Sequence, residues 1–240
     1  MKLALRSQAR HAFVALTLTI AIDLLAFDDV ARSATFTRAS PRDGGFHLGP
    51  PSIEINAAAC VSRLQAQGRG VRVASHPALS DKECSIAEPV YLESVRTMTG
   101  VIDLPARPLV ACGFAEAFAS FVGDLWAPLA NAHFGAQAIS IATGPGYSCR
   151  GRNRIAGAKV SAHGRGLALD MTSMKLSDGR VIMIKPSSPL AGDAFWAALR
   201  RAACGWFTTV LGPGSDAAHA DHIHFDIEPH GSSGRYRICQ

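Results

Sequence analysis

Two short stretches, SAHGRGLALD at residues 161–170 and HADHIH at residues 219–224, decide how this chain of 240 residues folds and what it binds. Both are rich in side chains that ligate metals. A structural zinc site usually closes with four Cys or His ligands, whereas two histidines and one carboxylate leave one position free for a water that the metal can acidify. Only a folded domain can bring two such distant stretches together. They predict a zinc-dependent hydrolase.

The local pattern indicates which of these side chains face the metal. His163 and Asp170 flank small residues that allow a backbone turn to approach an ion before the chain enters a strand. Side chains at positions 222 and 224 point to the same face of a strand, because the strand period is two. We expect His163 and Asp170 to be ligands, with one of His222 and His224 binding zinc and the other facing the substrate.

Hydrolysis at such a site needs a base that accepts a proton from the attacking water. Asp221 and His219 are the candidates, and His222 is placed to orient the water or to stabilise an oxyanion. Asp221 and Asp226 have an alternative role, because carboxylates behind a metal site commonly hold the ligand histidines in the correct tautomer. The residues alone leave these roles open.

The first 34 residues have the order of a secretory signal. A basic start that includes Lys2 and Arg6 precedes an apolar run over residues 12–22, and small residues lie at 31–34. The run is short for a bilayer span. We expect a signal peptide, or an uncleaved signal anchor, over residues 1–34 and a protein exported to the periplasm or cell envelope. Any contact with the membrane would be made through that anchor.

The cysteines agree with export. Their number is even and none forms a CxxC pair, which argues against a thiolate zinc site and for three disulfides in an oxidising compartment. Pairing of sequence neighbours is the expectation among fifteen connectivities. The expected pairs are Cys60 with Cys84, Cys112 with Cys149, and Cys204 with Cys239.

The charge balance argues against nucleic acid as a partner. Lys and Arg number 24 against 19 acidic residues, a formal net charge of +5, and the excess is spread along the chain. Proteins that bind nucleic acid usually cluster positive charge on one face or helix. A dispersed excess fits an anionic cell envelope or an acidic polymer.

The rest of the chain reads as a linker followed by one domain. Residues 35–56 are rich in Gly and Pro and predict a flexible linker, and order begins at residue 57. Apolar periodicity predicts helices over 57–67, 114–133 and 190–203, the second kinked or ended by Pro128. Alternation predicts strands at 71–73, 138–142, 159–161, 167–171, 180–184 and 223–227, with a hairpin turn at 177–179. We therefore expect a single α+β domain over 57–240, with a central antiparallel sheet and flanking helices.

The two metal-rich stretches also carry a resemblance. The pattern S-x-H-x-x-G-x-A-x-D at residues 161–170, followed by H-x-H at residues 222–224, resembles the zinc DD-peptidase and hedgehog-type fold group. That group includes D-alanyl-D-alanine carboxypeptidases, phage endolysin peptidases and a murein endopeptidase. The resemblance implies that fold, with zinc held by His163, Asp170 and His224, and hydrolysis of cell-wall peptides.

A longer pattern, from Cys60 to Cys239, resembles bacterial proteins of the extensin-like C-terminal family. The matching stretches are YSCRGRN at 147–153, the zinc motif, LSDGR at 176–180, AC at 203–204, VLGPGSD at 210–216 and HADHIHFD at 219–226. The proline-rich repeats of plant extensins are absent from the sequence. A structural cell-wall role of the extensin kind would need them.

The resemblance also suggests roles for residues around the metal. In the peptidases the base is commonly a carboxylate three residues before the last zinc histidine, which is the position of Asp221. The murein endopeptidase instead favours His219, with His222 beside the water. Arg150 resembles an upstream arginine that stabilises the oxyanion or grips a substrate carboxylate, with a structural salt bridge as the alternative. Ser161, which opens the motif, is a further candidate substrate contact.

Together these features predict an exported zinc peptidase that cleaves the D-amino-acid-containing peptides of peptidoglycan, as a carboxypeptidase or an endopeptidase. The partner would be peptidoglycan peptide or another envelope polymer. The alternative is a non-catalytic, zinc-containing module that binds or supports the cell envelope.

Overall fold

The computed structural model describes residues 57–77, 83–185, 192–234 and 236–240. The predicted signal segment (1–34) and linker (35–56) lie outside these residues. No helix in the described ranges is long and apolar enough to cross a membrane.

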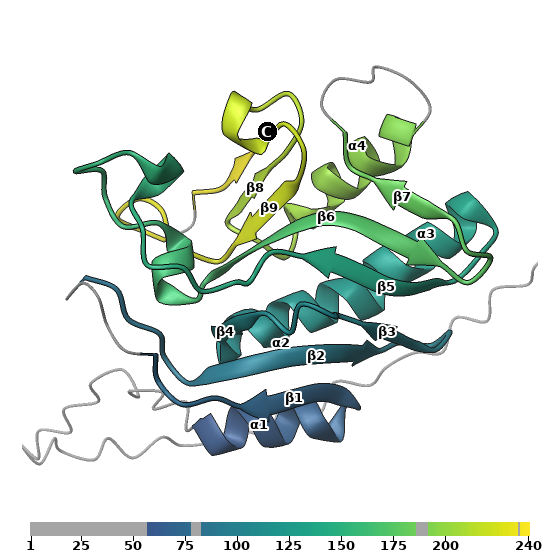
Figure 1. Ribbon diagram of the computed structural model, residues 1–240, viewed down its shortest axis with the longest axis horizontal. Helices are drawn as coiled ribbons and strands as arrows, with labels where there is room; N and C mark the ends of the chain where they lie inside the picture. Colours follow the sequence, from purple (N-terminus) through teal and green to yellow (C-terminus); the bar gives the residue numbers. More distant parts are fainter. Residues whose placement is uncertain (1–56, 78–82, 186–191, 235) are drawn as a thin grey trace, which may run out of the picture. The chain divides into compact units, whose positions relative to one another are not determined.

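One sheet organises the described residues, in the order β1-β2-β3-β5-β6-β9-β8-β10, with β4 added to β2 and β7 to β6 (Figure 1). The strands are β1 (Arg69–Val73), β2 (Pro89–Arg96), β3 (Val101–Asp103), β4 (Leu109–Ala111), β5 (Ala138–Thr143), β6 (Ala168–Leu176), β7 (Val181–Met183), β8 (Thr209–Leu211), β9 (Ile223–Asp226) and β10 (Ile238–Cys239).

The expected α+β class is confirmed, but the sheet is mixed and not purely antiparallel. β3 pairs with β5, and β8 with β10, in parallel. Parallel neighbours need a long connection between them. The chain supplies one from β3 to β5 through β4 and a helical segment, and another from β8 to β10 through β9 and the turns after it. Strand alternation in the sequence carries no information about these connections.

The helices are α1 (Ala57–Ala66), α2 (Cys112–Phe121), α3 (Ala127–Phe134) and α4 (Gly192–Ala203), with a π-turn η1 (Val122–Trp126) and 3₁₀ turns η2 (Arg152–Arg154), η3 (Ala162–Arg165) and η4 (Ala217–His219). The single helix predicted over 114–133 is thus α2, η1 and α3 in succession. The wide turn η1, in which Ala127 N–H donates to the Val122 carbonyl, comes just before Pro128. Pro128 occupies the first turn of α3, where its missing N–H is tolerated. The helical path therefore continues past the proline.

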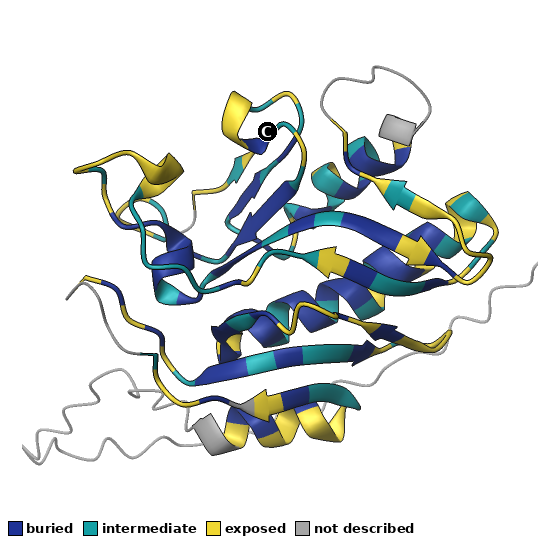
Figure 2. Ribbon diagram, in the orientation of Figure 1, coloured by how far each residue is buried: buried dark blue, intermediate teal, exposed yellow. Residues whose placement is uncertain are grey.

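An aromatic core lies between α2 and the strands that carry the candidate site. Phe114, Phe118 and Phe121 are fully buried on α2, as their predicted stripe requires. The ring centroids of Phe121 and Phe225 of β9 lie 5.3 Å apart, and those of Phe207 and Phe225 lie 4.9 Å apart. Figure 2 shows α2 and β9 largely in the colour of buried residues. β9 is thereby held by its apolar face.

Most predicted strands are present, and one is wrong. Residues 159–161 form no strand: Val160 makes only an isolated bridge to Gly151, and Ser161 starts the turn η3. The predicted hairpin at 177–179 is confirmed, with β6 and β7 antiparallel and Leu176 N–H bonded to the Arg180 carbonyl at 2.8 Å. Strands β2, β3, β4, β8 and β10 were not predicted.

Three disulfides are present, but neighbour pairing is wrong for two of them. The observed pairs are Cys60–Cys112, Cys84–Cys149 and Cys204–Cys239. Cys60 on α1 meets Cys112 at the start of α2 because those two helices pack against each other. Cys84 is joined to Cys149 beside the turn η3. Spacing along the chain does not reveal such packing.

Candidate metal centre

Three donor atoms from distant parts of the chain meet at one point. They belong to His163 on the turn η3, Asp170 on β6 and His224 on β9. Asp170 and His224 are directly opposite each other in the antiparallel β6–β9 pair. The atoms His163 Nε2, Asp170 Oδ1 and His224 Nδ1 form a triangle with edges of 2.9, 3.2 and 3.3 Å.

This triangle has the size of one face of a zinc tetrahedron. Ligand bonds of about 2.0–2.1 Å in tetrahedral geometry put neighbouring donor atoms about 3.3 Å apart. Two imidazole nitrogens and one carboxylate oxygen are also a donor set that zinc accepts. The three residues therefore fit a zinc ion with one position left open.

Hydrogen bonds behind the triangle fix the tautomer of each histidine, as inferred from the partner atoms. His163 Nδ1–H donates to the Gly146 carbonyl at 2.7 Å, and His224 Nε2–H donates to Asp226 Oδ2 at 3.0 Å. In the neutral imidazoles the nitrogens that face each other are then both acceptors. Asp170 adds a third acceptor. Such a cluster has no proton of its own to share and calls for a cation at its centre.

The pKa shifts of Asp170 and His224 in the metal-free triangle also indicate a place for positive charge. Burial alone would lower the pKa of His224, but hydrogen bonds and negative charge from Asp170 and Asp226 raise it to about 9. Burial works to raise the pKa of Asp170, and the hydrogen bonds from His163 and His224 outweigh it, leaving that pKa well below its usual value. Without a metal the triangle takes up a proton instead.

The small residues of the turn η3 also serve the packing around His163. The sequence suggested that small residues let the backbone approach the ion. A Cβ at Gly164 would lie 2.7 Å from Val160 Cγ1 and 3.1 Å from Cys84 Sγ, so the turn packs against the Cys84–Cys149 disulfide. Gly166 ends the turn with φ +67°. The small residues serve packing and chain reversal around His163.

Two aspartate–histidine pairs lie next to the triangle. Asp216 Oδ1 accepts from His219 Nδ1 at 2.7 Å, and Asp221 Oδ1 accepts from His222 Nδ1 at 2.9 Å. His222 Nε2 is 3.6 Å from Asp170 Oδ1. Burial lowers the pKa of His219 even though Asp216 opposes the effect. His219 is therefore held neutral, with Nε2 able to accept a proton.

Asp221 is placed differently from the other candidates. Its side chain is 73 % exposed and its carboxylate contacts His222 rather than the triangle. Asp226 lies behind His224, and its Oδ1 accepts from the Thr208 hydroxyl at 3.1 Å and from the Glu228 N–H at 3.0 Å. Asp226 thus holds a candidate ligand histidine, which was the alternative role considered for it, whereas Asp221 holds His222, which lies outside the triangle.

The two residues proposed as substrate contacts also lie at the site. Ser161 Oγ accepts from the backbone N–H of His163 at 3.4 Å and caps the turn η3. Arg150 Nε is buried and has no hydrogen-bond partner. Burial lowers the pKa of Arg150 while the charge of Asp170 works to raise it, and a guanidinium remains charged in either case. Ser161 has a local structural contact, whereas Arg150 has an unused donor.

All of these side chains except Asp221 line one pocket of about 520 Å³. Its wall also contains residues that were not predicted as site residues, among them Arg152, Asn153, Arg154, Thr209, Leu211, Asp216, Ala218, Glu228 and His230. Glu228 is buried and pairs with Arg165 at 2.6 Å and Arg152 at 3.5 Å. No spacing rule pointed to this ion-pair network, which joins η3, η2 and the segment that follows β9.

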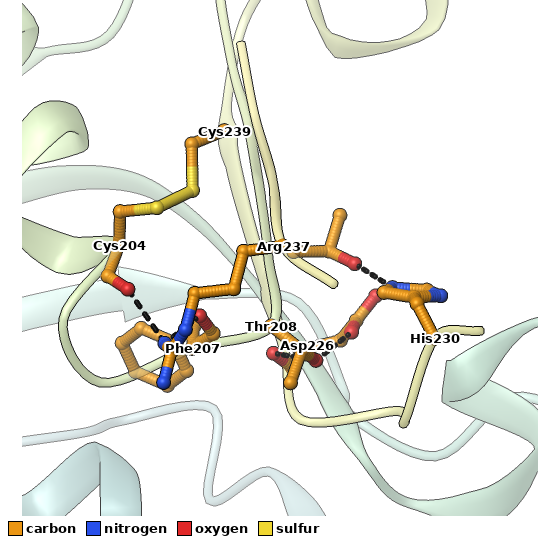
Figure 3. Close-up of a disulfide and its surroundings, with 8 residues drawn as sticks. Cys204, Phe207, Thr208, Asp226, His230, Arg237 and Cys239 are labelled. Atoms are coloured by element: carbon orange, nitrogen blue, oxygen red, sulfur yellow. Dashed lines mark hydrogen bonds between the residues drawn. A yellow bond between two sulfur atoms is a disulfide. The ribbon is translucent and has the colours of Figure 1, made fainter. Parts of the chain in front are cut away.

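The C-terminal segment supports the back of the pocket. Arg237 donates to the carbonyl oxygens of Cys204 and Phe207, both at 2.6 Å, beside the Cys204–Cys239 disulfide. Figure 3 shows these contacts with Thr208, Asp226 and His230 nearby. The disulfide and Arg237 hold β10 against β8, the neighbour of β9.

A second group of residues within metal-binding distance is Cys60, Glu88 and Cys112. Its two cysteines are joined in a disulfide and offer no thiolate. Among the described residues, the triangle of His163, Asp170 and His224 is therefore the candidate metal centre.

Comparison with known proteins gives one match. Residues 58–240 match the family described as Extensin-like protein C-terminus. No curated protein and no solved structure matches the chain.

Proposed function

The chain belongs to the extensin-like protein C-terminus family, and from that premise we propose that it is an exported zinc-dependent peptidase that cleaves D-amino-acid-containing peptides of peptidoglycan. The observation that carries the proposal is the triangle of His163 Nε2, Asp170 Oδ1 and His224 Nδ1 at the wall of an open pocket. The link to the zinc DD-peptidase fold group rests on the motif resemblance and belongs to this proposal.

Zinc held by the triangle would act as a Lewis acid on a scissile carbonyl and would lower the pKa of water. Around it the chain supplies the groups that move protons and hold charge. Neutral His219, oriented by Asp216, is our candidate general base. His222, oriented by Asp221, would place the water or bind the oxyanion. Arg150 would pair with a substrate oxygen through its unused donor.

The three disulfides fit a protein that folds in an oxidising compartment, which supports export. Periplasm or cell envelope is our proposed destination. Peptidoglycan is present there.

The test is to incubate the purified, zinc-loaded protein with peptidoglycan digests and to identify new peptides by mass spectrometry. His163→Ala is the blank, and His76→Ala, which removes an exposed histidine outside the pocket, is the matched control. We expect fragments from the wild type and from His76→Ala and none from the blank. Intact zinc binding without any fragment would contradict the peptidase and leave the non-catalytic zinc-containing envelope module.

The base is tested separately. His219→Ala should keep zinc and lower kcat by about 100- to 10,000-fold, the usual contribution of general acid–base catalysis. Asp221→Ala should lower kcat less than His219→Ala does, because Asp221 acts only through His222. The reverse order of effects would assign the base to Asp221.

A further inference from the structure

One ligand of the triangle is positioned by a turn, whereas the other two are positioned by the sheet. Asp170 and His224 face each other across the β6–β9 pair, so the pairing of two strands sets their separation. His163 lies on the 3₁₀ turn η3, which precedes β6. The three donor atoms meet at 2.9 to 3.3 Å. Whatever holds η3 in place therefore also sets the shape of the metal centre.

A segment that begins at Cys84 contacts this turn. A Cβ on Gly164, the residue after His163, would lie 3.1 Å from Cys84 Sγ, so the sulfur packs directly against η3. The next residue along the segment adds a hydrogen bond, because the Ser85 N–H donates to the Gly164 carbonyl at 3.0 Å. The segment thus holds the turn through both a sulfur atom and the backbone.

The segment that ends at Cys149 holds the ligand itself. The Ser148 N–H donates to the His163 carbonyl at 3.1 Å, and His163 Nδ1–H donates to the Gly146 carbonyl at 2.7 Å. This segment therefore fixes the backbone and the ring of His163 together, which directs Nε2 toward the other two donor atoms. The Cys84–Cys149 disulfide joins the two segments that bind η3, although its cysteines are 65 residues apart in the sequence.

We propose that the Cys84–Cys149 disulfide positions His163, so that opening this one bond weakens zinc binding while the rest of the fold persists. The inference rests on the zinc centre of the proposed function and adds to it a control by thiol reductants. The two sulfur atoms do not belong to the triangle, so the disulfide acts through the turn. An oxidising compartment keeps the bond closed and the centre intact.

A dithiol reductant can reach this bond more easily than a buried one. Both of its cysteines line a recess of about 650 Å³, and Cys149 is partly exposed, whereas Cys60 and Cys112 are fully buried. One thiolate of the dithiol attacks a sulfur of the disulfide, and its second thiol then resolves the mixed disulfide. Two electrons and two protons pass to the chain, and the dithiol becomes a disulfide. We expect Cys84–Cys149 to open before Cys60–Cys112.

The zinc affinity of two matched double variants tests the positioning role. In the purified full chain, Cys84→Ser with Cys149→Ser should weaken zinc binding about 10- to 100-fold, the usual effect of losing a partner that orients a ligand. Competition with a chelator of known affinity measures it. Cys60→Ser with Cys112→Ser is the control, because that disulfide spans 52 residues against 65 and so constrains the unfolded chain to a similar extent. The control should bind zinc like the wild type.

A second measurement needs no metal. The amide protons of Ser85 and Ser148 are donated to η3, so their exchange with solvent in the metal-free protein reports how often those hydrogen bonds open. Measured by NMR, this exchange should be about 10-fold or more faster in Cys84→Ser with Cys149→Ser than in the wild type. The control double variant should exchange both amides at the rate of the wild type.

Stepwise reduction of the wild type avoids substitutions and also applies if a double variant does not fold. After brief exposure to a dithiol, the reductant is removed and the free thiols are alkylated, because thiolates would bind zinc themselves. Mass spectrometry then locates the opened pair. Zinc affinity should fall in the fraction in which Cys84 and Cys149 alone are labelled.

Equal zinc affinity in the two folded double variants, or unchanged exchange of both amides, would overturn the positioning role. A wild type that takes up no zinc contradicts the proposed metal centre, and the exchange measurement then decides alone whether the disulfide holds η3. Zinc binding that depends on the disulfide, without hydrolysis of peptidoglycan, supports the positioning role and contradicts the peptidase. Hydrolysis that continues unchanged after the bond opens contradicts the positioning role and supports the peptidase.

Discussion

The two faces of β6, β8 and β9 meet different surroundings. On one face Leu169, Val210 and Phe225 lie side by side across the three strands and enter the aromatic core. On the other face Asp170 and His224 are cross-strand neighbours, and Asp226 follows two residues later behind His224. A shift of one residue in the pairing would exchange the two faces.

The two faces differ in how strictly their contacts depend on particular side chains. The core face contributes buried apolar area, for which other side chains of similar volume can substitute at modest cost. The metal-site face consists of polar atoms that contact specific polar partners, so that removal of one atom leaves another unsatisfied. We therefore expect substitutions on one face to change stability and those on the other to change zinc affinity.

The largest effect should follow loss of a ligand. Asp170→Ala removes one of three protein donors, and zinc affinity should fall well beyond the about 10- to 100-fold that loss of an outer partner costs. Competition with a chelator of known affinity measures it. Asp103→Ala, which removes an exposed carboxylate on β3, should bind zinc like the wild type. Stoichiometric, tight zinc in Asp170→Ala would contradict the assigned ligand set.

A substitution on the core face should lower stability rather than zinc affinity. Phe225→Ala should lower the free energy of unfolding by about 3–5 kcal/mol, because it opens a cavity among Phe118, Phe121 and Phe207. Urea unfolding of the metal-free protein with its disulfides intact measures the change. Val181→Ala, on the exposed edge strand β7, should change it by less than about 0.5 kcal/mol. Equal losses in the two variants would mean that the aromatic cluster does not support β9.

A smaller effect should follow from the carboxylate behind the metal. Asp226→Asn keeps the shape of the side chain and removes the charge that His224 Nε2–H meets, so zinc affinity should fall about 10- to 100-fold with the fold intact. Asp221→Asn changes a carboxylate that holds His222, which is not one of the three ligands, and should leave zinc affinity unchanged. Similar losses in both variants would contradict this division.

A further effect should be a pH dependence of the stability of the metal-free protein. The pKa of His224 is raised from 6.5 to about 9 in the folded state, so folding favours its protonated form. That contribution to stability is complete below about pH 6.5 and is lost as pH rises through about 9. Urea unfolding across this range should show the loss in the metal-free wild type and not in metal-free His224→Gln. Identical pH profiles of stability in the wild type and His224→Gln would contradict a raised pKa of His224.

Local patterns in the sequence brought forward His163, Asp170 and one of His222 and His224 as candidate ligands, and the family resemblance favoured His224. The alternation around His224 and the small residues around His163 are visible in any six- to ten-residue window. Strands β8 and β10 have three and two residues, too few to show a period. The eight-residue β2 has partly buried residues on both faces, so its pattern is not a clean alternation.

Contacts between residues far apart in the sequence could not be predicted for a different reason. The Cys60–Cys112 pair joins residues 52 positions apart and depends on how α1 packs against α2. The ion pairs of Glu228 with Arg165 and Arg152 depend on three segments that meet only in the folded domain. Such contacts follow from topology, and one sequence contains no separate signal for them.

The most direct test of the account is the zinc content and metal coordination of the purified protein, measured by elemental analysis and X-ray absorption. We predict one zinc per chain, bound by nitrogen and oxygen ligands at about 2.0–2.1 Å with no sulfur, and loss of that zinc in His163→Ala. A protein that takes up no zinc at stoichiometric concentration, or one whose zinc remains in His163→Ala, would contradict the proposed centre.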